Sequence, residues 1–491
     1  MWRRHRDLLH NASTLVATTV VNAGLGFFYW ALAARLFNQR SVGYGAATIS
    51  AMILLGTIGM FGLGTLLMGE LPRRKDRGGL VSAALITSSV CSLILGLGFA
   101  VVAPHISGHL MGIGGSPGLV ALFAVGVALA AFTFVVDNAA IGIMHGGIQL
   151  ARNSAFAVAK LLILPATAFI FHGVFGIGIA CSWIAGMVVS LVPVAVRLRV
   201  SRTPMLPKPD WRLLQGLGKT ALAHNWLNLA MAVPVLLMPV IVTATVSASA
   251  NAAYYVAWMM AYFLYSIPTN LSTVLFAIAA ADPEVIAEKL RFSLRLSFVL
   301  GIIGMVVLAL SSRLVLGIFG PSYVRTAFFP LMLFIIGYIP LVPRTHFVAV
   351  RRAQGRIPQA AVILTIGAAM EVIGAVIGAK LDGLVGLTWA LLLVRIIEGL
   401  MTTPAVVRAS LARGRLGKTR SDAESDASSP PSPTTYNERQ QAGIAMLIYR
   451  YANLKSYFYN RKGSENIAIG EPKLAKANHG PSKVPTHGDS A

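Results

Sequence analysis

The sequence predicts an all-α polytopic membrane protein of about twelve transmembrane helices, arranged as two six-helix bundles. Three observations lead to this fold class. Of the 491 residues, 56% are hydrophobic and only 12% are charged, whereas soluble proteins carry about 25% charged residues. The apolar residues form long continuous runs, and the basic residues gather in alternate connections between those runs. A soluble enzyme and a mainly disordered chain are therefore excluded for most of the length.

Twelve apolar runs approach or exceed the roughly 20 residues that a helix needs to cross the hydrocarbon core. They cover residues 13–34, 43–67, 80–103, 117–144, 154–172, 174–196, 220–243, 252–280, 294–316, 326–349, 359–379 and 384–407. The runs are continuous rather than alternating, so membrane-spanning β-strands are not expected. The first run exceeds the apolar stretch of a signal peptide, about 7–15 residues, so we expect it to remain as a helix.

The distribution of Lys and Arg predicts that both termini are cytoplasmic. Cytoplasmic loops are enriched in these residues, and the net charge is +23. With a cytoplasmic N-terminus, the outer segments hold only Arg35, Arg40, Arg313, Arg325 and Lys380. We expect a multi-pass protein of the plasma (inner) membrane whose basic loops meet anionic lipids of the inner leaflet. This explains the charge without nucleic acid as a partner.

The membrane region divides into two parts around a linker rich in Pro, Lys and Arg. The expected units are a six-helix bundle over 1–200, a cytoplasmic linker over 201–219, a second bundle over 220–410, and a mostly disordered cytoplasmic tail over 411–491 with a possible amphipathic segment at 442–459. His10-Asn11 opens the first span and His224-Asn225 opens the seventh. This match suggests an internal repeat, with the two halves related by an axis along the membrane normal.

Few charged residues fall inside the predicted spans, and each is a candidate functional residue because charge is costly in hydrocarbon. Asp137 and Lys160 lie about 10 Å deep from the inner side, on spans joined by a short loop, and are expected to pair. Arg152 and Arg344 lie near inner ends of spans and are expected to reach the interface. For the Asp137–Lys160 pair, a structural role and a role in substrate or proton movement both remain open.

A second pair is predicted near the membrane midplane. Glu371 and Arg395 lie on the last two spans, which a short loop makes neighbours. Glu398 follows Arg395 by about one helical turn and is a competing partner. The predicted coupling or gating pairs are therefore Asp137 with Lys160 and Glu371 with Arg395.

Uncharged polar residues on spans 1 and 7 are expected to face a cavity or another helix. The candidate substrate-binding residues are Arg35, Asn22, Lys160, Asn225, Asn228 and Arg395. No catalytic residue, metal ligand or cofactor is expected. Cys91 and Cys181 both lie in apolar runs, which offers neither a disulfide framework nor metal-ligand spacing.

Several short motifs carry a family resemblance over residues 8–410. They are Ala34-Arg35-Leu36-Phe37, Val42-Gly43-Tyr44-Gly45, Gly59-x-x-Gly62-x-Gly64, Leu71-Pro72-Arg73 and Leu316-Gly317-Ile318-Phe319-Gly320-x-x-Tyr323. In these the chain resembles the polysaccharide-biosynthesis transporters, the Wzx-like lipid-linked oligosaccharide flippases. They belong to the multidrug/oligosaccharidyl-lipid/polysaccharide exporter (MOP) superfamily, which also holds the MATE drug antiporters.

The resemblance implies two six-helix bundles in a V around a cationic central cavity. It also implies alternating access that moves a polyprenyl-diphosphate-linked saccharide outward for cell-surface polysaccharide biosynthesis. Arg35 matches the family's arginine at the end of span 1. Polysaccharide assembly enzymes are further candidate partners.

Two other functions remain open. A cation-coupled multidrug antiporter usually needs a membrane acid, and spans 1, 7 and 8 contain none, although Asp137 or Glu371 would serve. A membrane-embedded glycosyltransferase or ligase needs acids near the outer face, where Asp382 is the only one. The flippase is preferred, because a diphosphate head group needs a wet, cationic path through the membrane.

Overall fold

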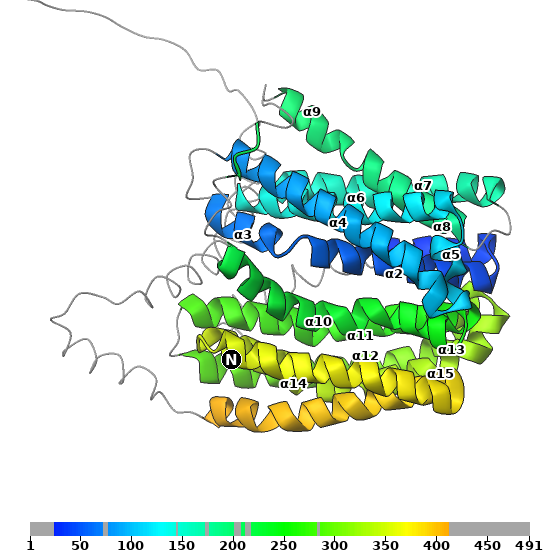
Figure 1. The fold of residues 1–491 in the computed structure, drawn as a ribbon. Helices are drawn as coiled ribbons and strands as arrows, with labels where there is room; N and C mark the ends of the chain where they lie inside the picture. The colour runs from blue at the N-terminus through cyan, green and yellow to red at the C-terminus, as the bar shows by residue number, and fades with distance from the viewer. Residues whose placement is uncertain are drawn as a thin grey trace, which may run out of the picture. The chain divides into compact units, whose positions relative to one another are not determined.

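The computed structural model describes residues 24–71, 77–143, 146–171, 176–200, 208–211, 218–281 and 285–411. Within these ranges the regular structure is helical, with no strand. The helices run side by side along one common direction (Figure 1). The predicted all-α fold class is confirmed. Asn22 and the proposed amphipathic segment 442–459 lie outside the described residues.

The first half contains the helix over residues 24–36 and nine labelled elements. These are α2 (Gln39–Gly59), α3 (Leu63–Glu70), α4 (Gly78–Ile106), η3 (Gly108–Leu110), α5 (Met111–Gly114), α6 (Pro117–Gly142), α7 (Gly146–Ile170), α8 (Ile177–Val189) and α9 (Val192–Val200). The predicted span 43–67 is broken between α2 and α3. Phe61 and Gly62 adopt positive φ angles of 48° and 75° there. Glycine tolerates this conformation at little cost, so the glycine-rich segment ends one helix and starts another.

The second half contains six elements. They are α10 (Gly218–Thr245), α11 (Ala248–Ala281), α12 (Ile286–Phe319), α13 (Pro321–Ile336), α14 (Tyr338–Ala353) and α15 (Ile357–Leu411). The predicted span 326–349 is a bent pair, because α13 and α14 meet at 48°. α15 covers the last two predicted spans. Asp382 and Gly383 are not helical, and the chain folds back at this point.

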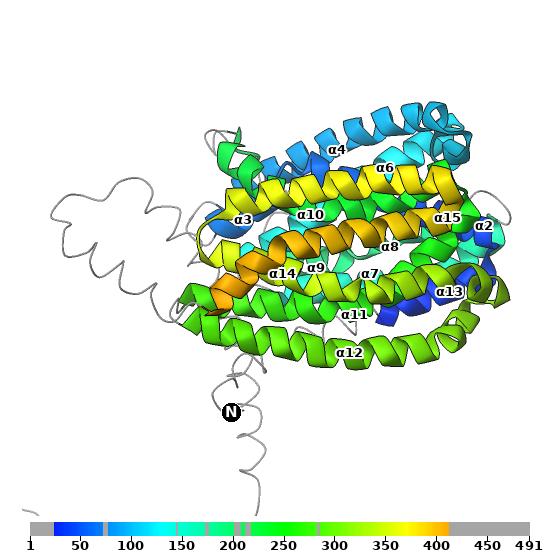
Figure 2. The same ribbon diagram turned by 90° about the horizontal axis from the view of Figure 1, so that it is seen from below.

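The two arms of α15 pack closely because glycines face each other across the fold. The backbones at Gly378 and Gly386 approach so closely that neither position has room for a Cβ atom. Further along the two arms, Gly367 lies against the side chain of Glu398. Figure 2 shows the two arms, yellow and orange, side by side. This hairpin brings the charged residues of both arms to the same depth.

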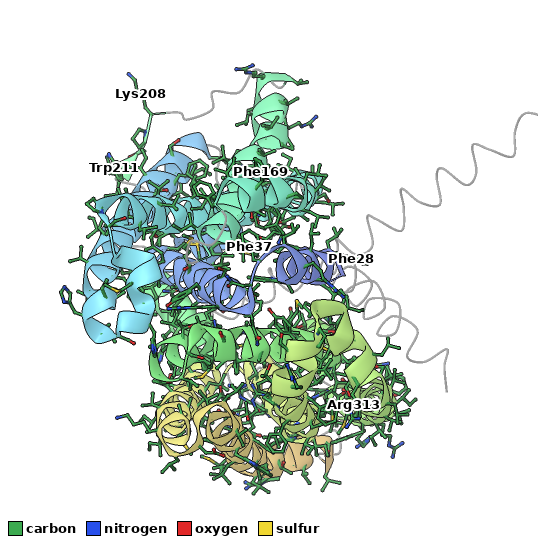
Figure 3. The ribbon with its side chains drawn as sticks, turned by 90° about the vertical axis from the view of Figure 1, so that its right-hand side faces the viewer. Phe28, Phe37, Phe169, Lys208, Trp211 and Arg313 are labelled. Carbon is green, nitrogen blue, oxygen red and sulfur yellow. The ribbon has the colours of Figure 1, made fainter. Side chains whose placement is uncertain are left out.

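Eight helices among the described residues are long and apolar enough to cross a membrane, or nine if α13 with α14 counts as one span. α15 is one of the eight, yet its two arms are two spans. Together with α11 and the helix at 24–36, these elements account for about twelve spans. Large apolar side chains also point outward: Phe169 is 87% exposed, Leu310 83% and Leu381 81%. Phe169, on α7, is labelled in Figure 3. The chain is therefore a multi-pass membrane protein.

The two halves share one hydrophobic core along α2. In Figure 1, α4 and α6 to α9 lie above α2, and α10 to α15 lie below it. α2 packs against both α10 and α11. One continuous apolar cluster joins Tyr29 and Trp30 from the first half to Tyr254 and Met260 from the second. The contact between the halves is therefore apolar in this cluster.

Basic residues collect at one end of the helices, called the basic end here (left in Figure 1). Its described residues include Arg77, Arg152, Lys208, Arg291, Arg351, Arg352, Arg356 and Arg408. The opposite end has Arg35, Arg40, Arg313, Arg325 and Lys380. Because the basic end of a membrane protein normally faces the cytoplasm, we expect this end to be inside.

This orientation predicts the result of reporter fusions. A reporter inserted within residues 201–210, and one fused after Arg415, should both report a cytoplasmic location. A fusion in the connection between α12 and α13 serves as the matched outer control. A periplasmic or extracellular signal from either of the first two positions would contradict the predicted topology.

Candidate functional site

The second half holds a cavity of about 320 Å³ between α10, α11, α14 and α15. Its wall is mainly apolar and aromatic, with Trp258, Tyr262, Tyr265 and Phe276 from α11. Four charged residues also line it, namely Arg344, Arg352, Glu371 and Arg395. It runs from the middle of these helices toward the basic end. A mainly apolar pocket with a few converging polar groups is the usual form of a ligand site.

The predicted midplane residues meet at the deep end of this cavity. Glu371 Oε1 lies 3.9 Å from Arg395 Nε, across the hairpin of α15. Glu398, which we expected to compete for Arg395, instead lies 3.1 Å from Arg344 Nε of α14. Arg344 therefore does not extend to the interface as predicted, because a buried carboxylate holds it within the bundle. The functional role of the Glu371–Arg395 pair stays a prediction.

Aromatic side chains hold Arg395 in place. Its Nη1 donates a hydrogen bond of 2.7 Å to the Tyr265 hydroxyl, which donates in turn to the Phe334 carbonyl at 2.6 Å. The guanidinium also lies 5.3 Å from the centre of the Trp258 ring. Cation–π contacts of this kind strengthen when water is excluded. Tyr265 and Trp258 were not predicted as site residues, since many aromatic residues occupy such spans for packing alone.

Several atoms of the two ion pairs, Glu371–Arg395 and Glu398–Arg344, lack a hydrogen-bond partner. They are Glu371 Oε1, Arg395 Nε, Arg344 Nε and both carboxylate oxygens of Glu398. Buried polar atoms are almost always hydrogen-bonded in folded proteins. Leaving a charged group unsatisfied costs more than about 1–3 kcal/mol. The four side chains thus attract each other through charge, but they retain bonding capacity toward a ligand.

Arg352 marks the mouth of the cavity near the basic end. It also lines a second, more open hollow of about 460 Å³ with Met231, Val235 and Asn228. Within the part of the chain that the structure describes, the Arg352 side chain forms no ion pair or hydrogen bond. The sequence alone did not indicate Arg352 as a site residue, because its position on a cavity wall depends on how α14 packs.

The two asparagines predicted on span 7 have different places. Asn228 lines the open hollow, and its Nδ2 donates to Thr65 Oγ1 of α3 at 3.4 Å, across the two halves. Asn225 is buried on α10 and is absent from the walls of both hollows. Asn228 is therefore the better-placed of the two for contact with a ligand.

The predicted Asp137–Lys160 pair is wrong. The Asp137 carboxylate instead binds Arg152 in a bidentate ion pair, with both N–O distances at 2.5 Å. Arg152 also donates to Ser190 Oγ at 3.2 Å and is only 5% exposed, so it does not reach the interface. Lys160 lies eight residues further along α7, about 12 Å away along the helix axis, so Arg152 is the cation that Asp137 can contact.

Lys160 is enclosed by aromatic rings instead. Its Nζ lies 3.9 Å from the centre of the Trp183 ring, 4.6 Å from Phe156 and 4.9 Å from Tyr29. It makes no ion pair within the described ranges and is 6% exposed. Three ring faces replace a carboxylate as the partners of this ammonium. Lys160 lines neither hollow and lies in the other half of the molecule.

Arg35 closes the opposite end rather than lining the cavity. Its Nε donates to the Ile318 carbonyl at 2.8 Å, and Nη2 donates to the Gly317 carbonyl at 3.3 Å. These carbonyls end α12, where the helix dipole favours a cation. Gln39 and Asn251 make further bonds between the halves nearby, to the Ser249 carbonyl at 3.2 Å and to the Gly43 carbonyl at 2.8 Å.

The Asp137–Arg152 pair should stabilise the first half more than Lys160 does. Asp137→Asn leaves an uncompensated buried arginine, which costs about 3–5 kcal/mol. Lys160→Met keeps most of the side-chain volume and loses only the cation–π attraction, about 2 kcal/mol. Thermal unfolding of both variants in the same detergent measures this difference. An equal loss for the two variants would contradict these assignments.

The Glu371–Arg395 pair should show coupling between its two members. Glu371→Gln alone leaves Arg395 with less compensation, and we expect a loss of about 3–5 kcal/mol. Glu371→Gln combined with Arg395→Gln removes both charges and should recover part of the lost thermal stability. Glu398→Gln with Arg344→Gln is the matched control pair. Strictly additive losses in the double variant would show that the two side chains do not interact.

Neither a protein-family profile nor a curated protein sequence matches the chain. Solved structures do match. The inward-facing conformation of a multidrug resistance MATE family transporter of the MOP superfamily has a TM-score of 0.62 at 15% identity, over 83% of this chain and 96% of that one. The outward-facing conformation of a transporter of that description scores 0.51 at 15% identity, over 82% and 95%.

A third structure is a MOP superfamily transporter from Pyrococcus furiosus Vc1, with a TM-score of 0.53 at 15% identity, over 82% of this chain and 95% of that one. Its binding pocket is described as having reverse polarity, suggesting a different function. The chain therefore has the fold of MOP superfamily transporters.

Proposed function

We propose that this protein is a membrane transporter that moves a polyprenyl-diphosphate-linked saccharide outward by alternating access. The observation that carries the proposal is the cavity in the second half. It combines an apolar, aromatic wall with three arginines, one of which, Arg352, has no partner at the mouth.

The charge balance of the cavity favours an anionic substrate. Arg344, Arg352, Arg395 and Glu371 line the cavity, and Glu398 pairs with Arg344 beside it. These five side chains together leave one net positive charge. The guanidinium group binds phosphate through paired, charge-assisted hydrogen bonds. A diphosphate at the mouth would meet Arg352 first, and Arg344 and Arg395 lie further along the same wall.

The aromatic wall suits the rest of such a substrate. Trp258, Tyr262 and Phe276 offer flat apolar faces with polar edges, which pack against rings and isoprene units alike. Thr269, Asn270 and Thr273 of α11 supply hydroxyl and amide groups along the same wall. A cavity lined only by arginines would bind inorganic phosphate equally well, so the aromatic residues give preference for a larger amphipathic molecule.

The bonds between the halves support an inward-facing state. Arg35, Gln39 and Asn251 bond across the halves at the end opposite the basic end. Toward the basic end, the hydrogen bond from Asn228 to Thr65 is long, at 3.4 Å. The TM-scores of 0.62 and 0.51 also rank the inward-facing relative above the outward-facing one. Each bond is worth about 0.5–1.5 kcal/mol net, so these bonds by themselves contribute only a few kcal/mol to keeping this end closed.

A MATE-like cation-coupled antiporter fits the fold equally well, and one observation favours it. Glu371 and Glu398 are buried carboxylates with unbonded oxygens, and buried acids in membrane proteins commonly carry protons or cations. The two functions differ in the charge of the substrate. A cationic drug would be repelled by Arg352, whereas a lipid diphosphate would be attracted.

Arg352→Gln tests the proposed function. In proteoliposomes carrying a fluorescent polyprenyl-diphosphate saccharide, the variant should transport at least tenfold more slowly, because a charge-assisted bond worth about 1.5–3 kcal/mol is lost. Arg295→Gln is the matched control, since Arg295 is exposed on α12 and lines neither hollow. The flippase proposal fails if Arg352→Gln transports at the wild-type rate, or if the wild type moves cationic drugs and not the lipid.

A further inference from the structure

Three arginines gather at the basic end, outside the cavity, where α14 turns into α15. Arg351 is in the last turn of α14, Arg356 directly precedes α15, and Arg408 is in the last turn of α15. They are called the basic-end arginine cluster here. The turn is tight, because Gly355 has a φ of 68° and the Arg356 amide donates to the Arg351 carbonyl at 2.9 Å. The turn therefore fixes two of the three arginines close together.

The cluster lacks compensating negative charge. The side chains of Arg356 and Arg408 are exposed and form no ion pair or hydrogen bond within the described part of the chain. Arg351 Nη1 donates to Gln354 Oε1 at 3.2 Å, whereas its Nε is buried without a partner. Burial first, and then the charges of Arg356 and Arg408, lower the pKa of the Arg351 guanidinium. The three cations are thus within electrostatic reach of one another.

The described residues around the three arginines supply little negative charge to neutralise them. Residues 285–295, 350–362 and 402–411 contain one carboxylate, Glu288 on the first turn of α12. Arg291 of the same helix adds a further positive charge and donates to the Ser410 carbonyl at 2.5 Å. An arrangement of mutually repelling cations is stabilised most by a group with several negative oxygens.

An exposed apolar surface continues from the cluster along α15. Leu400 is 68% exposed, Val407 45% and Leu411 69%. Their spacing of seven and four residues places them on one face of the helix, and Arg408 follows Val407 directly. A cationic head next to an apolar stripe, at the end of a membrane-spanning helix, matches a lipid with a phosphate head group.

We propose that the basic-end arginine cluster is a binding site for the phosphate of an inner-leaflet lipid, whose hydrocarbon chain lies along the exposed face of α15. The inference goes beyond the proposed transport and does not depend on it. Two lipids share this chemistry: an anionic phospholipid of the bilayer and the polyprenyl phosphate end of a substrate. Arg352 adjoins Arg351 and lines the cavity mouth, so a lipid held here lies beside the transport path.

Native mass spectrometry of the full-length protein in detergent tests the site. Phosphatidylglycerol, a polyprenyl phosphate, phosphatidylcholine and inorganic phosphate are added separately. We expect the two anionic lipids to bind at least tenfold more tightly than phosphatidylcholine or inorganic phosphate. Arg356→Gln combined with Arg408→Gln should remove most of this difference. Preference for the polyprenyl phosphate identifies the substrate as the source, and equal binding of both lipids identifies the bilayer.

The control variant carries Arg313→Gln and Arg325→Gln, which remove two exposed charges at the opposite end and should leave lipid binding unchanged. If lipid binding falls equally in both double variants, or falls in neither, the proposed binding site is overturned. Inorganic phosphate that binds as tightly as the lipids overturns the role of α15.

A full-length variant with Asp422→Asn, Glu424→Gln and Asp426→Asn tests the chain's own acidic segment. Lipid binding seen only in that variant means that this segment occupies the cluster, and it overturns the proposal.

Discussion

Hydrocarbon cannot form hydrogen bonds, and this constraint governs the rest of the structure. Every backbone N–H and C=O within the membrane must be bonded inside the protein, so the described chain is helical. The same constraint acts on side chains. Charged groups inside the bundle must find partners in neighbouring helices, and they do so in both halves. Asp137 binds Arg152, Glu398 faces Arg344, and Glu371 faces Arg395.

The two halves satisfy their buried charges differently, and this difference suggests different tasks. In the first half, Asp137 and Arg152 form a closed bidentate pair, with Ser190 as a further partner. In the second half, Arg344, Glu371 and Arg395 lie on a cavity wall and keep unbonded atoms. A fully bonded pair stabilises a bundle, whereas a partly bonded group can exchange partners with a ligand. The second half is therefore the better candidate for recognising a substrate.

Contacts between the halves are mainly apolar, and polar bonds are concentrated at the end opposite the basic end. Trp30 and Tyr255 meet across the seam, with ring centres 4.6 Å apart, close to the aromatic rings around Lys160. The few bonds of Arg35, Gln39 and Asn251 cost about 0.5–1.5 kcal/mol each to break and can reform. The seam thus has the properties that a rocking motion between two bundles requires.

The sequence by itself determined the membrane class, the positions of the helices and the basic bias of one end. These features follow from hydropathy and charge along the chain, which act locally. It also indicated that Glu371 and Arg395 lie at the same depth, because a short connection makes their helices neighbours. Tertiary structure alone decided which charges meet. Whether Asp137 contacts Arg152 or Lys160 depends on the rotation and axial offset of α6 and α7, to which hydropathy is insensitive. Three further features also combine residues from helices far apart in the chain, so only packing could bring them together. They are the aromatic rings around Lys160, the hydrogen bond between Arg395 and the Tyr265 hydroxyl, and the position of Arg352 at a cavity mouth.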